Sequence, residues 1–173
     1  EIYASYALQN PEKLKIVAVA EPVKERRQRL ASIHGLDASA MYDSWQDILD
    51  RPKMADGAII ATQDTMHVEP AVKALEKGYH VLLEKPMALT LENCNAIVDA
   101  SKRTGLTLNI CHVLRYIDFF WKVKSIIDSG IIGDVLTIYH AENVSYYHIA
   151  HSYVRCNWHR SDIASPMILA KCC

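Results

Sequence analysis

The sequence lacks three features that would each point to a class of protein. With 19 basic and 20 acidic side chains the formal net charge is −1, so no overall field favours nucleic acid or an anionic membrane. The longest apolar runs, such as Gly57–Ala61, are far shorter than the roughly 20 residues of a membrane-spanning helix. The five cysteines include no CxxC pair, which argues against a disulfide framework or a zinc knuckle. We therefore expect a cytoplasmic protein with reduced thiols and neither nucleic-acid nor membrane partners.

What is present is an ordinary globular composition. Half of the 173 residues are hydrophobic and 23% are charged, which is sufficient for a packed core. No basic stretch followed by an apolar segment opens the sequence, so no secretory signal is visible. A helix is expected at 1–9 without a strand and glycine-rich turn before it, and an apolar run stands close to residue 173. We expect a sequence that is truncated at both ends.

Short apolar runs alternate with helical patterns over most of the sequence. The predicted strands are 14–20, 57–61, 81–83 and 107–111. The predicted helices that follow them are 23–34, a short one from Ser44, 68–77, 91–103 and 119–128. Strands buried on both faces and joined by helices of this length indicate a parallel sheet with right-handed crossovers. The expected fold class is α/β, with a doubly wound parallel sheet.

The pattern changes after Gly133. Residues 135–141 predict a longer strand, whereas residues 143–160 are rich in Tyr and His and show no helical period. We place a domain boundary between residues 116 and 117, which leaves a second part that is small for an independent core.

In a doubly wound sheet, ligands bind beyond the carboxyl ends of the strands. The side chains at these ends are Glu21, Thr62, Glu84, Lys85 and His112. A carboxylate at Glu21 is placed to accept hydrogen bonds from an adenosine ribose and to repel a 2′-phosphate, although acids are also common in solvated loops. Lys24 and Arg26 stand close enough to blur the resulting preference for NAD over NADP.

The loop from Thr62 to His67 joins a strand to the start of a helix. Backbone amides and hydroxyls at such a place attract the phosphates or ribose of a cofactor. Asp64 and Thr65 are equally suited to capping the next helix, so this loop alone leaves both interpretations open.

Glu84 and Lys85 directly follow an apolar strand, and Pro86 comes after them. A lysine in the crevice beyond a strand can act as an acid, a base or a polariser of a carbonyl group. The alternative is a surface ion pair with Glu84, worth less than about 1 kcal/mol.

The segment Val81-Leu-Leu-Glu-Lys-Pro-Met-Ala88 resembles the EKP motif of the Gfo/Idh/MocA family, named after glucose-fructose oxidoreductase and inositol dehydrogenase. Further similar segments follow the family's order. They lie at 61–67, 74–81, 115–116, 130–135 and 158–160. The resemblance covers nearly the whole sequence from Leu14 onward.

This resemblance implies a Rossmann domain followed by a C-terminal α+β domain with an open mixed sheet. Residues 1–116 would be an incomplete NAD(P)-binding Rossmann domain without its first strand and G-x-G-x-x-G loop. Residues 117–173 would begin the substrate and oligomerisation domain, and the complete protein is expected to be a homo-oligomer. Members of the family move a hydride between NAD(P) and sugars, inositols or related polyols.

The resemblance also implies roles for individual residues. The residues expected at the cofactor are Glu21, Thr62, His67, Glu84 and Lys85, and Lys85 is also the expected catalytic residue. The residues expected at the substrate are Arg115, Trp158 and Arg160, to which the strand-end position adds His112.

Two other functions remain open from the sequence. A few members of the family use the bound cofactor for redox-assisted glycoside cleavage, so an NAD-assisted glycoside hydrolase is one alternative. The missing glycine-rich loop supports the other, a catalytically inactive Rossmann fragment that acts as a binding module. His148 and His151 have a spacing that can chelate zinc, but no carboxylate at helical spacing completes a set, and no metal site is predicted.

Overall fold

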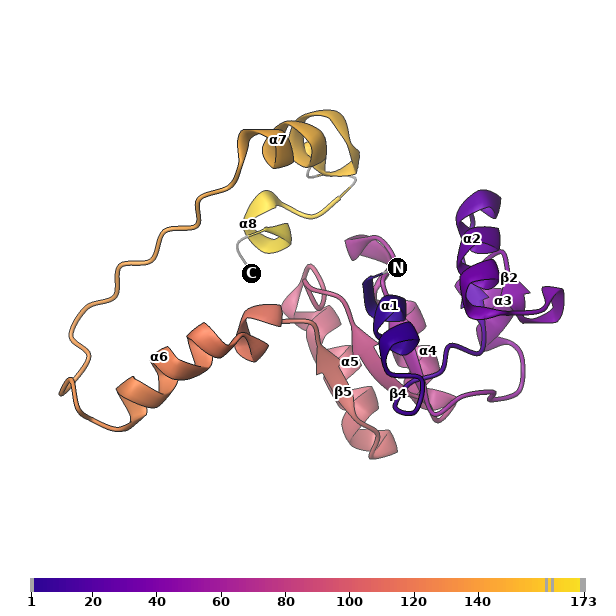
Figure 1. The fold of residues 1–173 in the computed structure, drawn as a ribbon, viewed down its shortest axis with the longest axis horizontal. Coiled ribbons are helices and arrows are strands. Elements are labelled where there is room, and N and C mark those ends of the chain that lie inside the picture. The colour runs from indigo at the N-terminus through magenta and orange to yellow at the C-terminus, as the bar shows by residue number, and fades with distance from the viewer. Residues whose placement is uncertain (1, 161, 163, 172–173) are drawn as a thin grey trace.

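Parallel strands form two separate sheets in the computed structural model, which describes residues 2–160, 162 and 164–171 (Figure 1). The larger sheet contains β3 (Gly57–Ile60), β4 (His80–Leu83) and β5 (Leu108–Ile110), side by side in chain order. The smaller one pairs β1 (Val19–Ala20) with β2 (Met41–Tyr42). The α/β class with parallel strands is therefore confirmed.

The expected single sheet is not formed, because β1 pairs with β2 and not with β3. The strand predicted at 14–20 is also shorter than expected. Only its last two residues are paired, since residues 14–18 have no hydrogen-bonded strand beside them in the described part of the chain. Apolar β-branched residues alone do not make a strand without a partner.

Two helices cover one face of the larger sheet and build the core. α4 (Val68–Glu76) connects β3 to β4, and α5 (Leu91–Thr104) connects β4 to β5 and packs on α4. Alternation along β4 buries Val81 and Leu83, whereas Leu82 faces the other side of the sheet. The core gathers the fully buried residues Ala71, Ala74, Leu75, Leu83 and Ile97.

Local signals in the sequence set the ends of several helices. The hydroxyl of Thr90 accepts a hydrogen bond from the backbone N–H of Asn93 over 3.2 Å and so caps α5, which ends at Gly105 with a φ of 68°. Ser44 forms a reciprocal capping box with Asp47 at the start of α3 (Trp45–Leu49). α2 (Lys24–His34) ends at Gly35, which has a φ of 62°. These starts and ends agree with the sequence.

α1 (Ile2–Gln9) confirms the helix predicted at the start of the sequence; Glu1 lies outside the described residues. The Tyr3 hydroxyl donates a hydrogen bond to the Glu84 carboxylate, at the carboxyl end of β4. This helix therefore reaches the edge of the sheet at which ligands are expected.

Beyond β5 the chain leaves the sheet. A 3-10 turn (Val113–Tyr116) leads into α6 (Asp118–Asp128), which confirms the helix predicted at 119–128. Residues 135–141 are not a strand, which makes that prediction wrong: the segment has no partner strand, and every residue from 121 to 143 is exposed. Between residues 111 and 171 the described part of the chain contains no strand, so the mixed sheet of a second domain and the boundary at 116/117 remain predictions.

The Tyr- and His-rich stretch is helical, contrary to the sequence prediction. It consists of α7 (Tyr146–Ile149), a π-helical segment (Ala150–Arg155) and a 3-10 turn (Asn157–His159), and α8 (Met167–Ala170) follows. The signal for its start is Ser145, whose hydroxyl accepts a hydrogen bond from the backbone N–H of His148 over 3.3 Å. None of the helices in the described ranges is long and apolar enough to span a bilayer.

Candidate active site at the strand ends

The carboxyl ends of the three strands of the larger sheet lie in register. The backbone N–H of Glu84 donates to the carbonyl of Ile60 over 2.9 Å, and that of Cys111 donates to the carbonyl of Leu83 over 2.9 Å. The loops that begin with Thr62, Glu84 and His112 therefore leave neighbouring strands at one edge. This is the edge at which a doubly wound sheet binds its ligands.

His67 fastens two of these loops to each other. Its imidazole is fully buried, with Nδ1 2.8 Å from the carbonyl oxygen of Pro86 and Nε2 3.2 Å from that of Thr62. A carbonyl oxygen can only accept, so the ring nitrogen that carries the proton donates to its carbonyl, and a neutral ring donates to one of the two at a time. His67 is thereby engaged with two loop backbones and holds Lys85, the residue before Pro86, next to the 62–67 loop.

Lys85 lies half-buried at the end of β4, not on an open face. Its ammonium group donates to the carbonyl oxygen of Ala170, and its backbone N–H donates to Oε2 of Glu84 over 3.0 Å. The peptide bond between Lys85 and Pro86 is cis. The amine thus contacts a carbonyl group in a segment that is remote in sequence.

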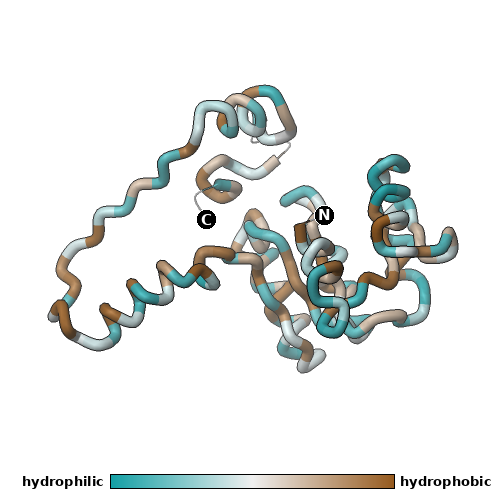
Figure 2. Tube along the Cα trace, in the orientation of Figure 1, coloured by the Kyte–Doolittle hydropathy of each residue, from teal (hydrophilic) through white to brown (hydrophobic). Residues whose placement is uncertain are grey.

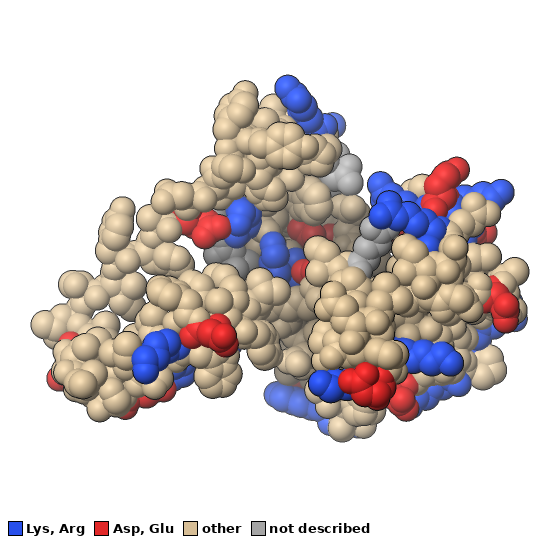
Figure 3. Space-filling view, in the orientation of Figure 1, with Lys and Arg blue, Asp and Glu red and all other residues tan. Residues whose placement is uncertain are grey.

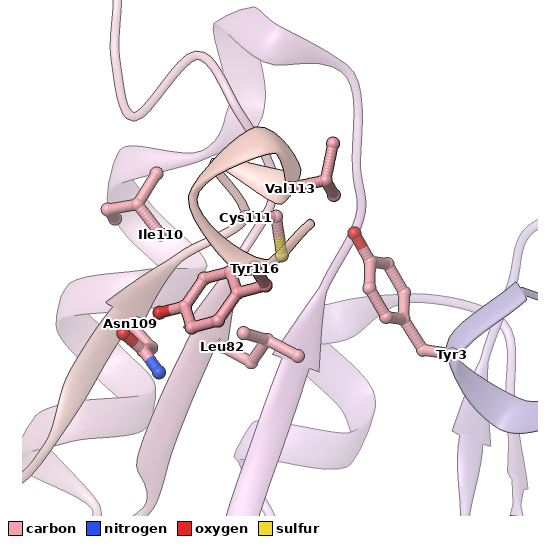
Figure 4. A pocket seen from close by; sticks show the side chains of 7 residues that line it. All are labelled: Tyr3, Leu82, Asn109, Ile110, Cys111, Val113 and Tyr116. Atoms are coloured by element: carbon pink, nitrogen blue, oxygen red, sulfur yellow. The ribbon is translucent and has the colours of Figure 1, made fainter. Parts of the chain in front are cut away.

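A small pocket of about 150 Å³ lies on the other face of the sheet, and its lining includes Tyr3, the residue that donates a hydrogen bond to Glu84 (Figure 4). Its lining consists of Tyr3, Leu82, Asn109, Ile110, Cys111, Val113 and Tyr116. Burial raises the pKa of the Tyr3 hydroxyl above its ordinary value, and the neighbouring Cys111 and Glu84 raise it further. Burial also raises the pKa of the Cys111 thiol. The raised pKa keeps this cysteine a neutral thiol at physiological pH.

Asp64 is the main residue of the site that sequence reasoning missed. It is buried, and its carboxylate accepts hydrogen bonds from Nε1 of Trp158, over 3.0 Å, and from the Ser165 hydroxyl. The sequence suggested only that Asp64 caps the next helix, but neither α4 nor the 3-10 turn before it has a side-chain cap. No signal in the sequence distinguishes this carboxylate, because both donors lie far along the chain.

Glu21 lies apart from these residues, at the end of β1 in the smaller sheet. Its backbone N–H donates to the carbonyl of Tyr42 over 3.1 Å, and its Oε1 accepts from the N–H of Val23 over 2.9 Å. Within the described residues, no hydrogen bond or ion pair joins Glu21 to Thr62 or Lys85. Lysine and arginine side chains gather over the neighbouring α2 (Figure 3).

The structure places the four residues predicted to contact the substrate in three different surroundings. Trp158 is brought to the strand ends through Asp64. His112 and Arg115 lie in the turn after β5, where the N–H of Arg115 donates to the carbonyl of His112 over 3.0 Å. Arg160 forms an exposed ion pair with Asp162, which keeps the pKa of Asp162 below its ordinary value. The substrate role of these residues stays a prediction.

Comparison with known proteins decides the family. The sequence profile of the Gfo/Idh/MocA oxidoreductases, described as an oxidoreductase family with an NAD-binding Rossmann fold, matches residues 2–112. The chain belongs to this family. The match covers α1, both sheets and the loops with Thr62, His67, Glu84 and Lys85, so the resemblance found in the sequence is confirmed.

The relatives differ in the reactions for which they are named. An inositol 2-dehydrogenase of Salmonella typhimurium is 30% identical over 139 residues, which is 78% of this chain and 41% of that protein. A 2,7-anhydro-N-acetylneuraminate hydratase of Mediterraneibacter gnavus is 31% identical over 136 residues, 79% of this chain and 35% of the relative. The chain spans between 24% and 42% of the length of the curated relatives that it matches.

Solved structures agree on the fold. The WlbA dehydrogenase of Bordetella pertussis, in complex with NADH and UDP-GlcNAcA, matches 75% of this chain and 36% of its own with a TM-score of 0.68 and 25% identity. A myo-inositol 2-dehydrogenase of Lactobacillus plantarum, at 23% identity, gives a TM-score of 0.64 over 70% of this chain and 35% of its own.

Proposed function

We propose that this chain is the cofactor- and substrate-facing part of an NAD-dependent oxidoreductase that transfers a hydride between nicotinamide and a hydroxyl-bearing carbon of a sugar, inositol or related polyol. The observation that supports this most directly is the position of Lys85. Its amine lies half-buried at the carboxyl end of β4, and the His67 contacts fix its backbone beside the Thr62 loop. The names of the relatives that act on inositol support the substrate class.

The residues present suit the two ends of a dinucleotide. At one end, Oε1 of Glu21 is bound to a backbone N–H, and its other carboxylate oxygen has no hydrogen bond among the described residues, so it can accept from a ribose hydroxyl. At the other end, Thr62 and His67 shape the loop beside Glu84 and Lys85. When bound, the cofactor supplies the hydride acceptor or donor at its nicotinamide ring.

Each residue at the strand ends has a distinct task in this proposal. The amine of Lys85 takes the proton from the substrate hydroxyl or returns it, and Glu84 and His67 hold the lysine in place. Trp158, together with His112, Arg115 and Arg160, would contact the substrate. The carboxylate of Glu21 favours NAD over a cofactor with a 2′-phosphate, and the basic residues of α2 make that preference modest.

The segment after residue 117 is proposed to begin the substrate domain, and the complete protein to be a homo-oligomer. α6 and the segment after it contain many apolar residues, coloured brown in Figure 2, and the side chains of most of them are exposed. The largest exposed fractions among them belong to Leu136 at 89% and Tyr139 at 94%. Apolar side chains exposed in such number are expected to be covered at an interface.

A second candidate is NAD-assisted chemistry without net oxidation, such as cleavage of a glycosidic bond or hydration of an anhydro sugar. It is favoured by the relatives that are named 2,7-anhydro-N-acetylneuraminate hydratase. Cofactor turnover distinguishes the two candidates. A dehydrogenase changes the nicotinamide absorbance in proportion to product, whereas the second reaction forms product with no net change.

The test is the substitution Lys85→Ala in the complete protein. Turnover of a polyol such as myo-inositol should fall by about a hundredfold or more, since that is the usual contribution of a positioned acid or base, while NADH still binds. Lys102→Ala, on the exposed side of α5, is the matched control and should leave turnover unchanged. Unchanged turnover in the Lys85 variant would refute its role. If the 173-residue chain shows no saturable NADH binding, the inactive-fragment alternative gains support.

A further inference from the structure

We propose that Asp64 is a positioning residue: its carboxylate fastens the segment that contains Trp158, Ser165 and Ala170 across the strand ends and so determines where the amine of Lys85 lies. The proposal deepens the function proposed above and rests on it only for the effect on turnover. Its structural part concerns contacts within this chain alone.

The contacts of Asp64 all lead to one distant segment. Nε1 of Trp158 and the hydroxyl of Ser165 both donate to the same oxygen, Oδ2. Asp64 is only 8% exposed and Ser165 only 1%, so the hydrogen bond between them is buried away from water, and the one from Trp158 is partly buried. A carboxylate is an acceptor only, and both of its donors come from residues more than ninety positions further along the chain.

The same segment makes a second contact with the strand ends. Ala170, five residues beyond Ser165 and only 5% exposed, accepts a hydrogen bond from the Lys85 amine through its carbonyl oxygen. Asp64 follows β3 and Lys85 follows β4, which are neighbouring strands. The two residues are thus two attachment points for one segment. Loss of the first attachment loosens the second.

A local role for Asp64 does not account for these contacts. The 3-10 turn that contains it and the helix α4 that follows have no hydrogen bond from a side-chain cap. The loop is held instead by the Thr62 hydroxyl, which donates to the carbonyl of Met66 over 3.2 Å, and by His67. Removal of the Asp64 carboxylate therefore acts mainly on the distant segment.

Because both donors bind the same oxygen of Asp64, two substitutions at this position can separate the presence of an acceptor from its absence. Asp64→Asn keeps one carbonyl oxygen that can accept both hydrogen bonds, whereas Asp64→Ala removes the acceptor. Both variants are made in a background with Trp45→Phe and Trp121→Phe, which leaves Trp158 as the only one of the three tryptophans. The two measurements are the emission of Trp158 and the rate at which acetic anhydride acylates Lys85, followed by mass spectrometry with Lys102 as internal reference.

We expect Asp64→Ala to shift the Trp158 emission to longer wavelength and to increase the acylation of Lys85 several-fold relative to Lys102. Asp64→Asn should resemble the parent in both measurements. Equal Lys85 reactivity in the parent and in Asp64→Ala would overturn the proposal, and so would an Asn variant that behaves like the Ala variant.

Two milder variants cover the case in which Asp64→Ala does not fold. Trp158→Phe and Ser165→Ala each remove one donor, and each should raise Lys85 acylation; no change in either would contradict the proposal. None of these measurements needs NAD or a substrate, so they stand even if the Lys85→Ala test refutes the proposed function. In the complete protein, Asp64→Ala should lower kcat more than it raises KM, and Asp64→Asn should restore kcat.

Discussion

The unit from Gly57 to Ile110 and the segment from Trp121 to Asn143 are both rich in Ile, Leu and Val, yet they differ completely in burial. In the first, Leu75, Leu83 and Ile97 are fully buried between the sheet and its helices. In the second, every residue is exposed, including Leu136 at 89%. An apolar residue is therefore buried only where a neighbouring element packs against it. A favourable strand propensity alone is not sufficient.

The largest expected effect tests this difference directly. Leu83→Ala removes a fully buried side chain from β4 and should lower the free energy of unfolding by about 2–5 kcal/mol. Leu136→Ala makes the same chemical change in the exposed segment and should alter it by less than about 0.5 kcal/mol. Urea denaturation followed by circular dichroism measures both. Similar losses in the two variants would show that the segment is packed in solution.

A smaller loss in the free energy of unfolding is expected when His67, which links the loops of Thr62 and Pro86, is removed. His67→Ala leaves the carbonyl oxygens of Thr62 and Pro86 without their buried partner, which should cost about 1–3 kcal/mol. His140→Ala, in the exposed segment, is the matched control and should have almost no effect. The two denaturation curves are compared at the same pH. Equal curves would mean that the loops are held together without His67.

The smallest effect is on the dependence of stability on pH. Burial raises the pKa of the Cys111 thiol above its ordinary 9.0 and that of Tyr3 above its ordinary 10.0. The folded chain therefore holds these protons more tightly than the unfolded chain. The free energy of unfolding should fall as the pH rises above about 9, where the unfolded thiol begins to ionise.

The combined variant Tyr3→Phe and Cys111→Ala should flatten this decline. Tyr139→Phe, which changes a tyrosine that is 94% exposed, should leave the decline as it is. Thermal unfolding followed between pH 8 and pH 11, a range chosen around the ordinary values, separates the variants. A steep decline that survives in the combined variant would assign the effect to other groups.

The elements that sequence predicted well are those with local signals. Thr90 and Gly105 mark the two ends of α5, and Ser44 marks the start of α3, because caps depend on residues within one turn. The wrong predictions are the strands at 14–18 and 135–141 and the lack of helix expected over residues 143–160. A strand needs a partner strand, and the sequence of a segment does not state whether one will lie beside it.

The candidate site also contains residues whose positions the sequence predicts and residues whose positions it does not. The topology of parallel strands was enough to predict that Thr62, Glu84 and Lys85 lie at one edge. The association of Glu21 with them was predicted from one continuous sheet, and the structure contains two. The role of Asp64 could not be predicted from the sequence, for a different reason. Its donors are 94 and 101 residues away, and nothing in the spacing indicates their approach.

The order of the larger sheet has a consequence for how the chain folds. Because β3, β4 and β5 are neighbours both in space and in sequence, each pairing closes only one short crossover. Contiguous supersecondary motifs of this kind often behave as cooperative folding units. Residues 57–110 should therefore fold as one cooperative unit that presents Asp64 and Lys85 on a single formed surface, onto which the segment with Trp158 and Ser165 docks.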